Sequence, residues 1–499
     1  MTIASTLPEL DTKLKQAHLL DTVGALLSWD EQVNLPPNSA DLRAAQRAVI
    51  ADVQHSAASD PHIGELLEFL EKERAQLTED QRVVLYWARR DYNKATKLPA
   101  DFVREKAEQS SRGYQAWKQA REKNDFASYA PVLQKNIELA KREAAYLGQG
   151  AAPYDYMIDC FDPGMKAAVI ETLFDELKIG LVPLVRQITS SKIKAREEAL
   201  RGFPVERQQT FLREVTQAIG FDYGRGRIDV SPHPFCSGSG ADVRMTTRYH
   251  ADNPLGSLFG SIHETGHGLY EQGLPIALHH TALGRAVGMG VHESQSRLWE
   301  NQVARSRGFW KFFEPKYRAT FPEQLGSISS EELYLAINAV APTLIRTEAD
   351  EVTYNLHIVL RFELEKKLFA GTLAVADLPK TWNAMSRELL GLEPANDSEG
   401  VLQDVHWSDG GFGYFPSYCI GNMMAAQLWY HVLGLRPQLE DDFARGDFTW
   451  LLGWLRKNIH ALGRRYDTLA LVKLATGEPL SPKYLLRYLK ERYGPLYLS

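Results

Sequence analysis

Cysteine is scarce in this chain. Only Cys160, Cys236 and Cys419 occur among its 499 residues. An odd and small number of cysteines cannot build the disulfide framework that stabilises small secreted proteins. We therefore expect the protein to be cytoplasmic, where thiols stay reduced.

The chain also lacks an excess of positive charge and long apolar runs. The formal net charge is -6, so no basic excess is available to neutralise phosphates, which argues against a nucleic-acid binder. No uncharged apolar run reaches the roughly 18 residues that a membrane span needs. The amino terminus has neither a basic segment nor a continuous apolar segment, so we expect no secretory signal and no membrane partner.

No flexible linker divides the chain. Hydrophobic residues make up 44% and charged residues 24%, which is typical of a folded globular protein. No glycine- and serine-rich tract, charge block or fixed-period repeat separates the two halves of the sequence. This uniformity predicts a single domain over residues 1–499, with two helical subdomains at most.

Helical periodicity dominates the sequence. Apolar residues recur at spacings of three and four from Leu7 to about Gly220, and the same pattern returns after Gly284. Between Phe221 and His250, polar and apolar residues alternate around a turn rich in proline, glycine and serine, which favours a small antiparallel sheet. The sequence therefore predicts a mainly α fold.

One short motif carries recognisable chemistry. His263 and His267 are four residues apart, so on a helix both imidazoles lie on one face and can bind one metal ion. Glu264 points about 100° away, which places its carboxylate beside the ion rather than on it. The alternative is a helix with two uninvolved histidines, since roughly one random chain in twenty of this composition would contain the motif.

A catalytic zinc site needs a third protein ligand. The metzincin pattern would require a glycine and a histidine where the chain has Tyr270 and Gly273, so that arrangement is excluded. Glu293 follows on the next helical segment and would complete a His2Glu set. Its neighbour His292 cannot share that direction on a helix.

Zinc bound by these residues would generate a nucleophile near neutral pH. The pKa of its bound water falls from about 16 to about 7. Glu264 would accept the proton and later deliver it to a leaving amine. Peptide hydrolysis is the reaction that this arrangement suits, and Co²⁺ could replace Zn²⁺ on the same ligands.

Two further segments carry polar patterns that are ambiguous by themselves. Helical spacing from Ile345 to Ile358 predicts one stripe that contains Arg346 and His357, for which a solvated helix face is the alternative. His406 and Trp407 precede a loop rich in glycine and tyrosine at residues 408–418. A buried tryptophan beside a hydrogen-bonded histidine explains this pair as well as a substrate contact does.

Taken together, these segments resemble the carboxypeptidase Taq family of metallocarboxypeptidases. The amino-terminal signature of that family is similar to Leu26-Leu27-Ser28-Trp29-Asp30, so the resemblance covers essentially the whole chain. Its other motifs follow in order: His233-Pro234-Phe235, Asp242-x-Arg244-x-Thr246, His263-Glu264-x-x-His267, His292-Glu293-Ser294-Gln295, Ile345-Arg346-x-x-Ala349-Asp350-Glu351 and Gly400-x-x-Gln403-Asp404-x-His406-Trp407.

The resemblance implies a neurolysin-like helical fold, with two lobes around a deep groove and zinc at its floor. It implies a cytosolic homodimer that acts on peptides with a free C-terminus. By motif position the metal ligands are His263, His267 and Glu293, and Glu264 is the general base.

The resemblance also implies how substrate is bound. Arg346 would hold the terminal carboxylate of the peptide, because a guanidinium forms two parallel hydrogen bonds with a carboxylate. Arg244 and His233 would line or close one end of the groove. His406, Tyr414 and Tyr418 would bind substrate or the developing oxyanion, and which of the two tyrosines faces the metal stays open.

Two other functions remain as alternatives. A zinc oligopeptidase would cut internal bonds of short peptides with the same metal and base but without the carboxylate anchor. A helical peptide-binding scaffold would use the metal only for structure. Activity on free and amidated peptides distinguishes all three.

Overall fold

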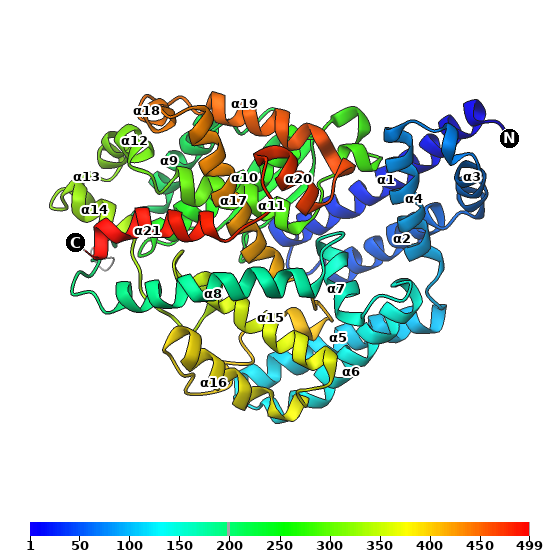
Figure 1. Ribbon diagram of the computed structural model, residues 1–499, viewed down its shortest axis with the longest axis horizontal. Coiled ribbons are helices and arrows are strands. Elements are labelled where there is room, and N and C mark those ends of the chain that lie inside the picture. The colour runs from blue at the N-terminus through cyan, green and yellow to red at the C-terminus, as the bar shows by residue number, and fades with distance from the viewer. Residues whose placement is uncertain (197–199, 499) are drawn as a thin grey trace.

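Helices form most of this computed structural model, which describes residues 1–196 and 200–498 (Figure 1). The predicted mainly α fold is confirmed. The first half of the chain contains helices Ile3–Val33 (α1), Ala40–Ala58 (α2), Pro61–Lys72 (α3), Glu79–Thr96 (α4), Ala100–Lys123 (α5), Phe126–Leu147 (α6), Pro153–Phe161 (α7), Ala167–Thr189 (α8) and Val205–Ala218 (α9).

The remaining elements surround the middle of the chain. They are strands Gly226–Val230 (β1), Cys236–Ser239 (β2) and Asp242–Thr247 (β3), and helices Pro254–Gly273 (α10), Met289–Arg297 (α11), Arg307–Thr320 (α12), Pro322–Leu325 (α13), Ser330–Ile337 (α14), Tyr354–Ala370 (α15), Leu378–Leu390 (α16), Pro416–Leu435 (α17), Leu439–Phe443 (α18), Thr449–Asn458 (α19), Thr468–Thr476 (α20) and Lys483–Tyr497 (α21). Within the described ranges, no helix combines the length and apolar character needed to cross a membrane.

The sheet is mixed rather than purely antiparallel. Strands β2 and β3 pair antiparallel, as the alternation predicted, but β1 runs parallel to β3. The chain leaves β1, crosses to the far edge to form β2, and returns as β3 between the two. Because Val243 and Met245 of β3 are fully buried, β3 takes the central position, where both of its edges are hydrogen-bonded.

The apolar interior divides into two clusters. The larger one extends along the chain from Trp117 to Tyr497 and includes α10, α11 and α17. The smaller one belongs to α1, α3 and α4, which lie together at one end of the molecule (Figure 1). Its members are Leu10, Ile63, Leu66, Leu67, Leu70, Leu77, Leu85 and Ala88.

The predicted helical stripe from residue 345 onward is wrong in its first half. Only a 3₁₀ turn forms at Arg346–Glu348, and α15 begins at Tyr354. The carboxylate of Asp350 accepts the backbone N–H groups of Val352 and Thr353 at 2.9 and 3.0 Å. This local bond competes with helix formation, so Arg346 and His357 belong to different elements and both are buried.

Candidate metal centre and active site

Helices α10 and α11 bring three potential ligands together. The Nε2 atoms of His263 and His267 each lie 3.6 Å from Oε2 of Glu293. Zinc–ligand bonds of 2.0–2.1 Å in tetrahedral geometry place ligand atoms about 3.4 Å apart. Two imidazoles and one carboxylate at this spacing therefore fit a single small cation such as Zn²⁺.

Small residues allow the helices to approach this closely. Helix α10 begins where the side chain of Asn253 accepts the backbone N–H of Gly256, with Pro254 in the first turn. A Cβ on Gly266, between the two histidines, would lie 2.5 Å from Cα of Ser296 on α11. A Cβ on Gly421 of α17 would likewise lie 2.5 Å from Cβ of Glu293 on α11.

We predict that Gly421→Ala weakens metal binding. The added methyl group must push Glu293 away from the histidines, and such overpacking costs about 1–3 kcal/mol of folding stability. Gly434→Ala is the matched control, because Gly434 lies on the same helix with open space around it and the change favours helix formation. Chelator competition and thermal unfolding check both variants, and equal zinc affinity in the two would contradict the prediction.

Each histidine has a hydrogen-bond partner on its other ring nitrogen. Nδ1 of His263 lies 2.9 Å from Oε2 of Glu300. Nδ1 of His267 lies 2.6 Å from Nδ1 of His292, whose Nε2 lies 2.9 Å from Oε1 of Glu271. Since both carboxylates accept, the consistent neutral tautomers leave Nε2 of His263 and His267 free for a metal ion.

An arginine joins the two carboxylates of α11 and its extension. Nε of Arg297 donates to Oε1 of Glu293 at 2.7 Å, and its Nη1 donates to Oε2 of Glu300 at 3.1 Å. After Arg297 the helix widens into a π-helical segment, Leu298–Val303, which carries Glu300. Burial opposes ionisation of Glu300, but Arg297 and His263 outweigh it and lower its pKa to about 2.

Glu264 is buried next to His263, and its side chain forms no hydrogen bond within the described residues. Within the described part of the chain, no donor lies within hydrogen-bonding distance of its carboxylate. Burial raises its pKa to about 7, with His263 opposing and Glu293 adding to the rise. A carboxylate with this pKa accepts protons efficiently near neutral pH.

Arg346 lies in a second buried polar cluster. Its Nε donates to Oδ1 of Asp404 at 3.0 Å, and its Nη1 donates to the hydroxyl of Tyr354 at 3.2 Å. Asp404 also accepts from Nε of Arg361 at 2.6 Å. The ring of Tyr354 faces the guanidinium of Arg297 at 4.6 Å, so this one tyrosine links the Arg346 cluster to the metal centre.

The three aromatic residues predicted to bind substrate belong to the same cluster. The ring of His406 stacks on Tyr414 at 5.4 Å, and Tyr414 contacts Tyr418 edge-on at 5.2 Å. The guanidinium carbon of Arg346 lies 5.2 Å from the centre of the Tyr418 ring. Burial lowers the pKa of His406 to about 4, with Arg346 contributing against the opposing charge of Asp404, so its imidazole is neutral.

Residues 9–493 match the family described as carboxypeptidase Taq (M32) metallopeptidase. The chain belongs to this family. It is 42% identical to thermostable carboxypeptidase 1 of Thermus thermophilus over 97% of each chain, and 38% identical to carboxypeptidase 1 of Bacillus subtilis over 95% of each.

Solved structures agree with this M32 membership. An M32 carboxypeptidase from Deinococcus radiodurans R1 superimposes with a TM-score of 0.96 at 42% identity, covering 99% of this chain and 100% of that one. Metallocarboxypeptidase 1 of Trypanosoma cruzi gives 0.92 at 35% identity, covering 98% and 99%. The resemblance predicted from the motifs is confirmed, and the chain is a metallocarboxypeptidase, a peptide hydrolase.

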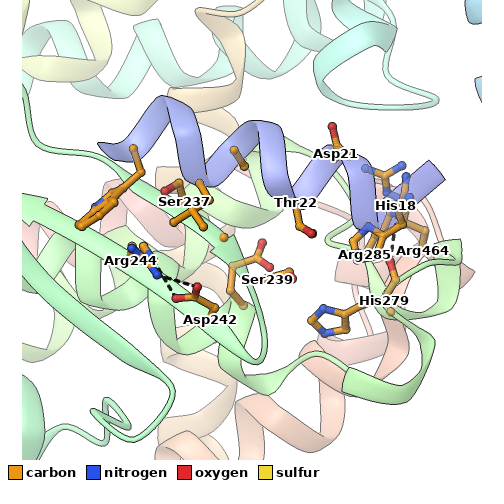
Figure 2. Close-up of a pocket in the computed structure, with 16 residues that line it drawn as sticks. His18, Asp21, Thr22, Ser237, Ser239, Asp242, Arg244, His279, Arg285 and Arg464 are labelled. Carbon is orange, nitrogen blue, oxygen red and sulfur yellow. Dashed lines mark hydrogen bonds and ion pairs between the residues drawn. The ribbon is translucent and has the colours of Figure 1, made fainter. Parts of the chain in front are cut away.

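Two predicted residues of this M32 chain form no bond or ion pair with the three clustered candidate ligands in the described part of the chain. Arg244 forms a two-bond ion pair with Asp242, covers the ring of Trp29 at 4.3 Å, and lines a pocket of about 310 Å³ beneath α1 (Figure 2). Glu271, which is bonded to His292 of the metal-site network, lines the same pocket as Arg244. His233 is exposed before β2, and among the described residues its side chain has no bonding partner.

Further residues of this M32 chain surround the candidate ligands. Glu271, Arg297, Glu300 and Tyr354 were not predicted. The Glu293–Arg297 spacing of four residues was an available signal, since such pairs interact on a helix. The other contacts form between separate elements and have no local pattern.

Proposed function

We propose that this enzyme removes single residues from the C-termini of peptides. His263, His267 and Glu293 would hold Zn²⁺, and Co²⁺ fits the same donor set. The observation that supports exopeptidase action is the buried cation Arg346, which is joined to the metal centre through Tyr354. A fixed positive charge beside the metal selects a substrate carboxylate near the bond to be cut.

The protein's own residues supply proton transfer in this proposal. Zn²⁺, when bound, supplies a Lewis acid that polarises the scissile carbonyl and acidifies water. Glu264 takes the proton of the attacking water and returns it to the leaving amine. Its carboxylate is free for this task because no described side chain occupies it.

Substrate positioning falls to the aromatic and arginine cluster. Asp404 and Arg361 hold the guanidinium of Arg346 in one orientation. His406, Tyr414 and Tyr418 are placed beside it to donate to substrate or to the oxyanion, and one such donor contributes about 3–4 kcal/mol to barrier reduction. Arg244 and His233 would line the far end of the groove.

We predict a ladder of one-residue losses from a free-ended decapeptide, recorded by mass spectrometry. The same peptide with an amidated C-terminus should be hydrolysed at least about 100-fold more slowly, because Arg346 loses its charged partner. Internal fragments, or equal rates on both peptides, would instead identify an oligopeptidase. A metal-replete sample without any hydrolysis would indicate a structural metal.

We propose one peptidase domain with two lobes around the substrate groove. The separate apolar cluster of α1, α3 and α4 supports a distinct amino-terminal lobe. A cavity of about 720 Å³ lies between this lobe and residues 285–292. The groove would follow that cavity toward the metal centre.

We also propose a cytoplasmic homodimer. Exposed apolar side chains on α1 and α2 offer a surface for a second copy, namely Leu19, Val23, Leu42, Val49 and Val53. The three cysteines are free thiols, which suits a reducing compartment. A monomer in sedimentation at micromolar concentration would contradict the dimer.

A further inference from the structure

The cavity between the two lobes has a charge opposite to that of the whole chain. Four basic side chains line it, Arg90, Lys94, Arg285 and Arg464, against the acidic Asp21 and Asp91. The chain as a whole carries a formal net charge of -6. The basic excess is therefore local to this cavity and attracts anions into it.

Arg464 contacts neutral groups rather than a carboxylate. Its Nε donates to the carbonyl of Ala286 at 2.6 Å, and its guanidinium faces the ring of Trp87 at 4.9 Å. Among the described residues, no carboxylate lies within ion-pair distance of it. Burial lowers the pKa of Arg464, and neighbouring Arg285 adds to this against the opposing charge of Asp91.

Arg285 is only weakly paired. Its Nη1 lies 3.5 Å from Asp91, and its Nε donates to the carbonyl of His279 at 3.3 Å. Arg90, by contrast, is fully engaged by Asp159 at 2.7 Å. Two guanidinium groups with unused donors thus face one cavity, and such groups suit the oxygens of a carboxylate.

A neutral histidine lies beside these two arginines. His18 lies beside Arg285 and Arg464 at one end of the adjoining pocket, opposite Arg244 and Asp242 (Figure 2). Its buried Nδ1 has no partner among the described residues. Burial lowers the pKa of His18 to about 4, with Arg285 contributing, so its imidazole is neutral.

We propose that Arg285 and Arg464 form an anion subsite that binds an acidic side chain of the substrate peptide, upstream of the bond that is cut. The proposal rests on the proposed peptidase function. His292, which is bonded to the metal-site residue His267, lines the same cavity, so this cavity extends to the edge of the metal-site network. A free small anion has the same chemistry and is the other source to test.

Paired neutral and acidic peptides test the subsite. A series carries Glu or Gln at each upstream position in turn, and kcat/KM is measured at low ionic strength. We expect at least one position at which Glu is preferred by about tenfold, as for one charge-assisted contact. The preference should fall to near unity in Arg285→Gln and in Arg464→Gln.

Arg387→Gln is the matched control. Arg387 is an exposed arginine of α16 that pairs with Glu393, so this variant should retain the full preference. If Arg464→Gln fails to fold, the preference measured in Arg285→Gln alone tests the subsite. Arg285 is partly exposed, so its replacement should disturb folding less. Hydrolysis of the Gln peptides by the unmodified enzyme tests the proposed peptidase function by itself, because these peptides do not need the subsite.

Sodium phosphate and sodium chloride distinguish the source of the anion. Stimulation by either salt at constant ionic strength is measured on a free-ended peptide that has no charged side chains. Stimulation that is lost in Arg285→Gln would show that the two arginines bind a free anion instead. No Glu preference at any position, together with no salt response, would overturn the proposal.

Discussion

Replacing Glu264 with glutamine is expected to lower kcat by about 10³-fold while leaving zinc bound, since general base catalysis typically contributes 10²–10⁴-fold. The amide has the size of the carboxylate but cannot accept the proton of the attacking water. Glu264 is not among the three clustered ligands, so their geometry should persist. Steady-state hydrolysis and zinc content per chain check the two parts of the prediction.

His263→Ala serves as the contrasting variant for Glu264. It removes one of three ligand atoms and should lose both zinc and activity. Wild-type turnover in Glu264→Gln would remove the proposed base, and loss of zinc in that variant would show that the carboxylate supports the metal instead.

Replacing Arg346 with alanine is expected to reduce kcat/KM by about 10²–10⁴-fold on peptides with a free C-terminus. Two charge-assisted hydrogen bonds to a carboxylate, worth about 1.5–3 kcal/mol each, account for this loss. Amidated peptides lack the charge that Arg346 recognises, so their slow hydrolysis should change little. The ratio of kcat/KM for the two peptides is the measurement.

Two controls separate recognition from folding at Arg346. Arg346→Lys keeps the positive charge but loses the two-pronged geometry, so an intermediate loss is expected. In Arg346→Ala the carboxylate of Asp404 still has Arg361 as its partner, which limits the destabilisation. Equal losses on free and amidated peptides would argue against the assigned role of Arg346.

The sequence was sufficient to bring two of the three candidate ligands together, because that prediction depends on local geometry. Four residues of helix place His263 and His267 on one face, whatever the surrounding fold. Glu293 followed from the chemistry of a third ligand and from its motif, and the structure brings it to the two histidines. The membership in the M32 family was likewise readable from ordered motifs.

The surroundings of the cluster could not be predicted in this way. Glu271 reaches His267 only through His292, and Glu300 reaches His263 only because α10 packs against the extension of α11. These contacts depend on how separate helices pack. The direction of β1 was missed for a similar reason, since alternation identifies a strand but not its partner.

The helix predicted over residues 345–353 does not form, for a different reason. Polar residues at helical spacing fit a helix, yet Asp350 can bond to its own backbone neighbours instead. Arg346 is also held by its bonds to Asp404 and Tyr354. Helical periodicity in the sequence gives no information about these two contacts.

The π-helical segment after Arg297 makes the number of residues, and not only their identity, part of the catalytic design. Deleting one residue there would relax the wide turn to ordinary α geometry, because a π-bulge amounts to one inserted residue. Glu300 would rotate off His263 although every side chain of the network was retained. Point substitutions do not test this dependence on chain length, whereas deletion of a single residue would.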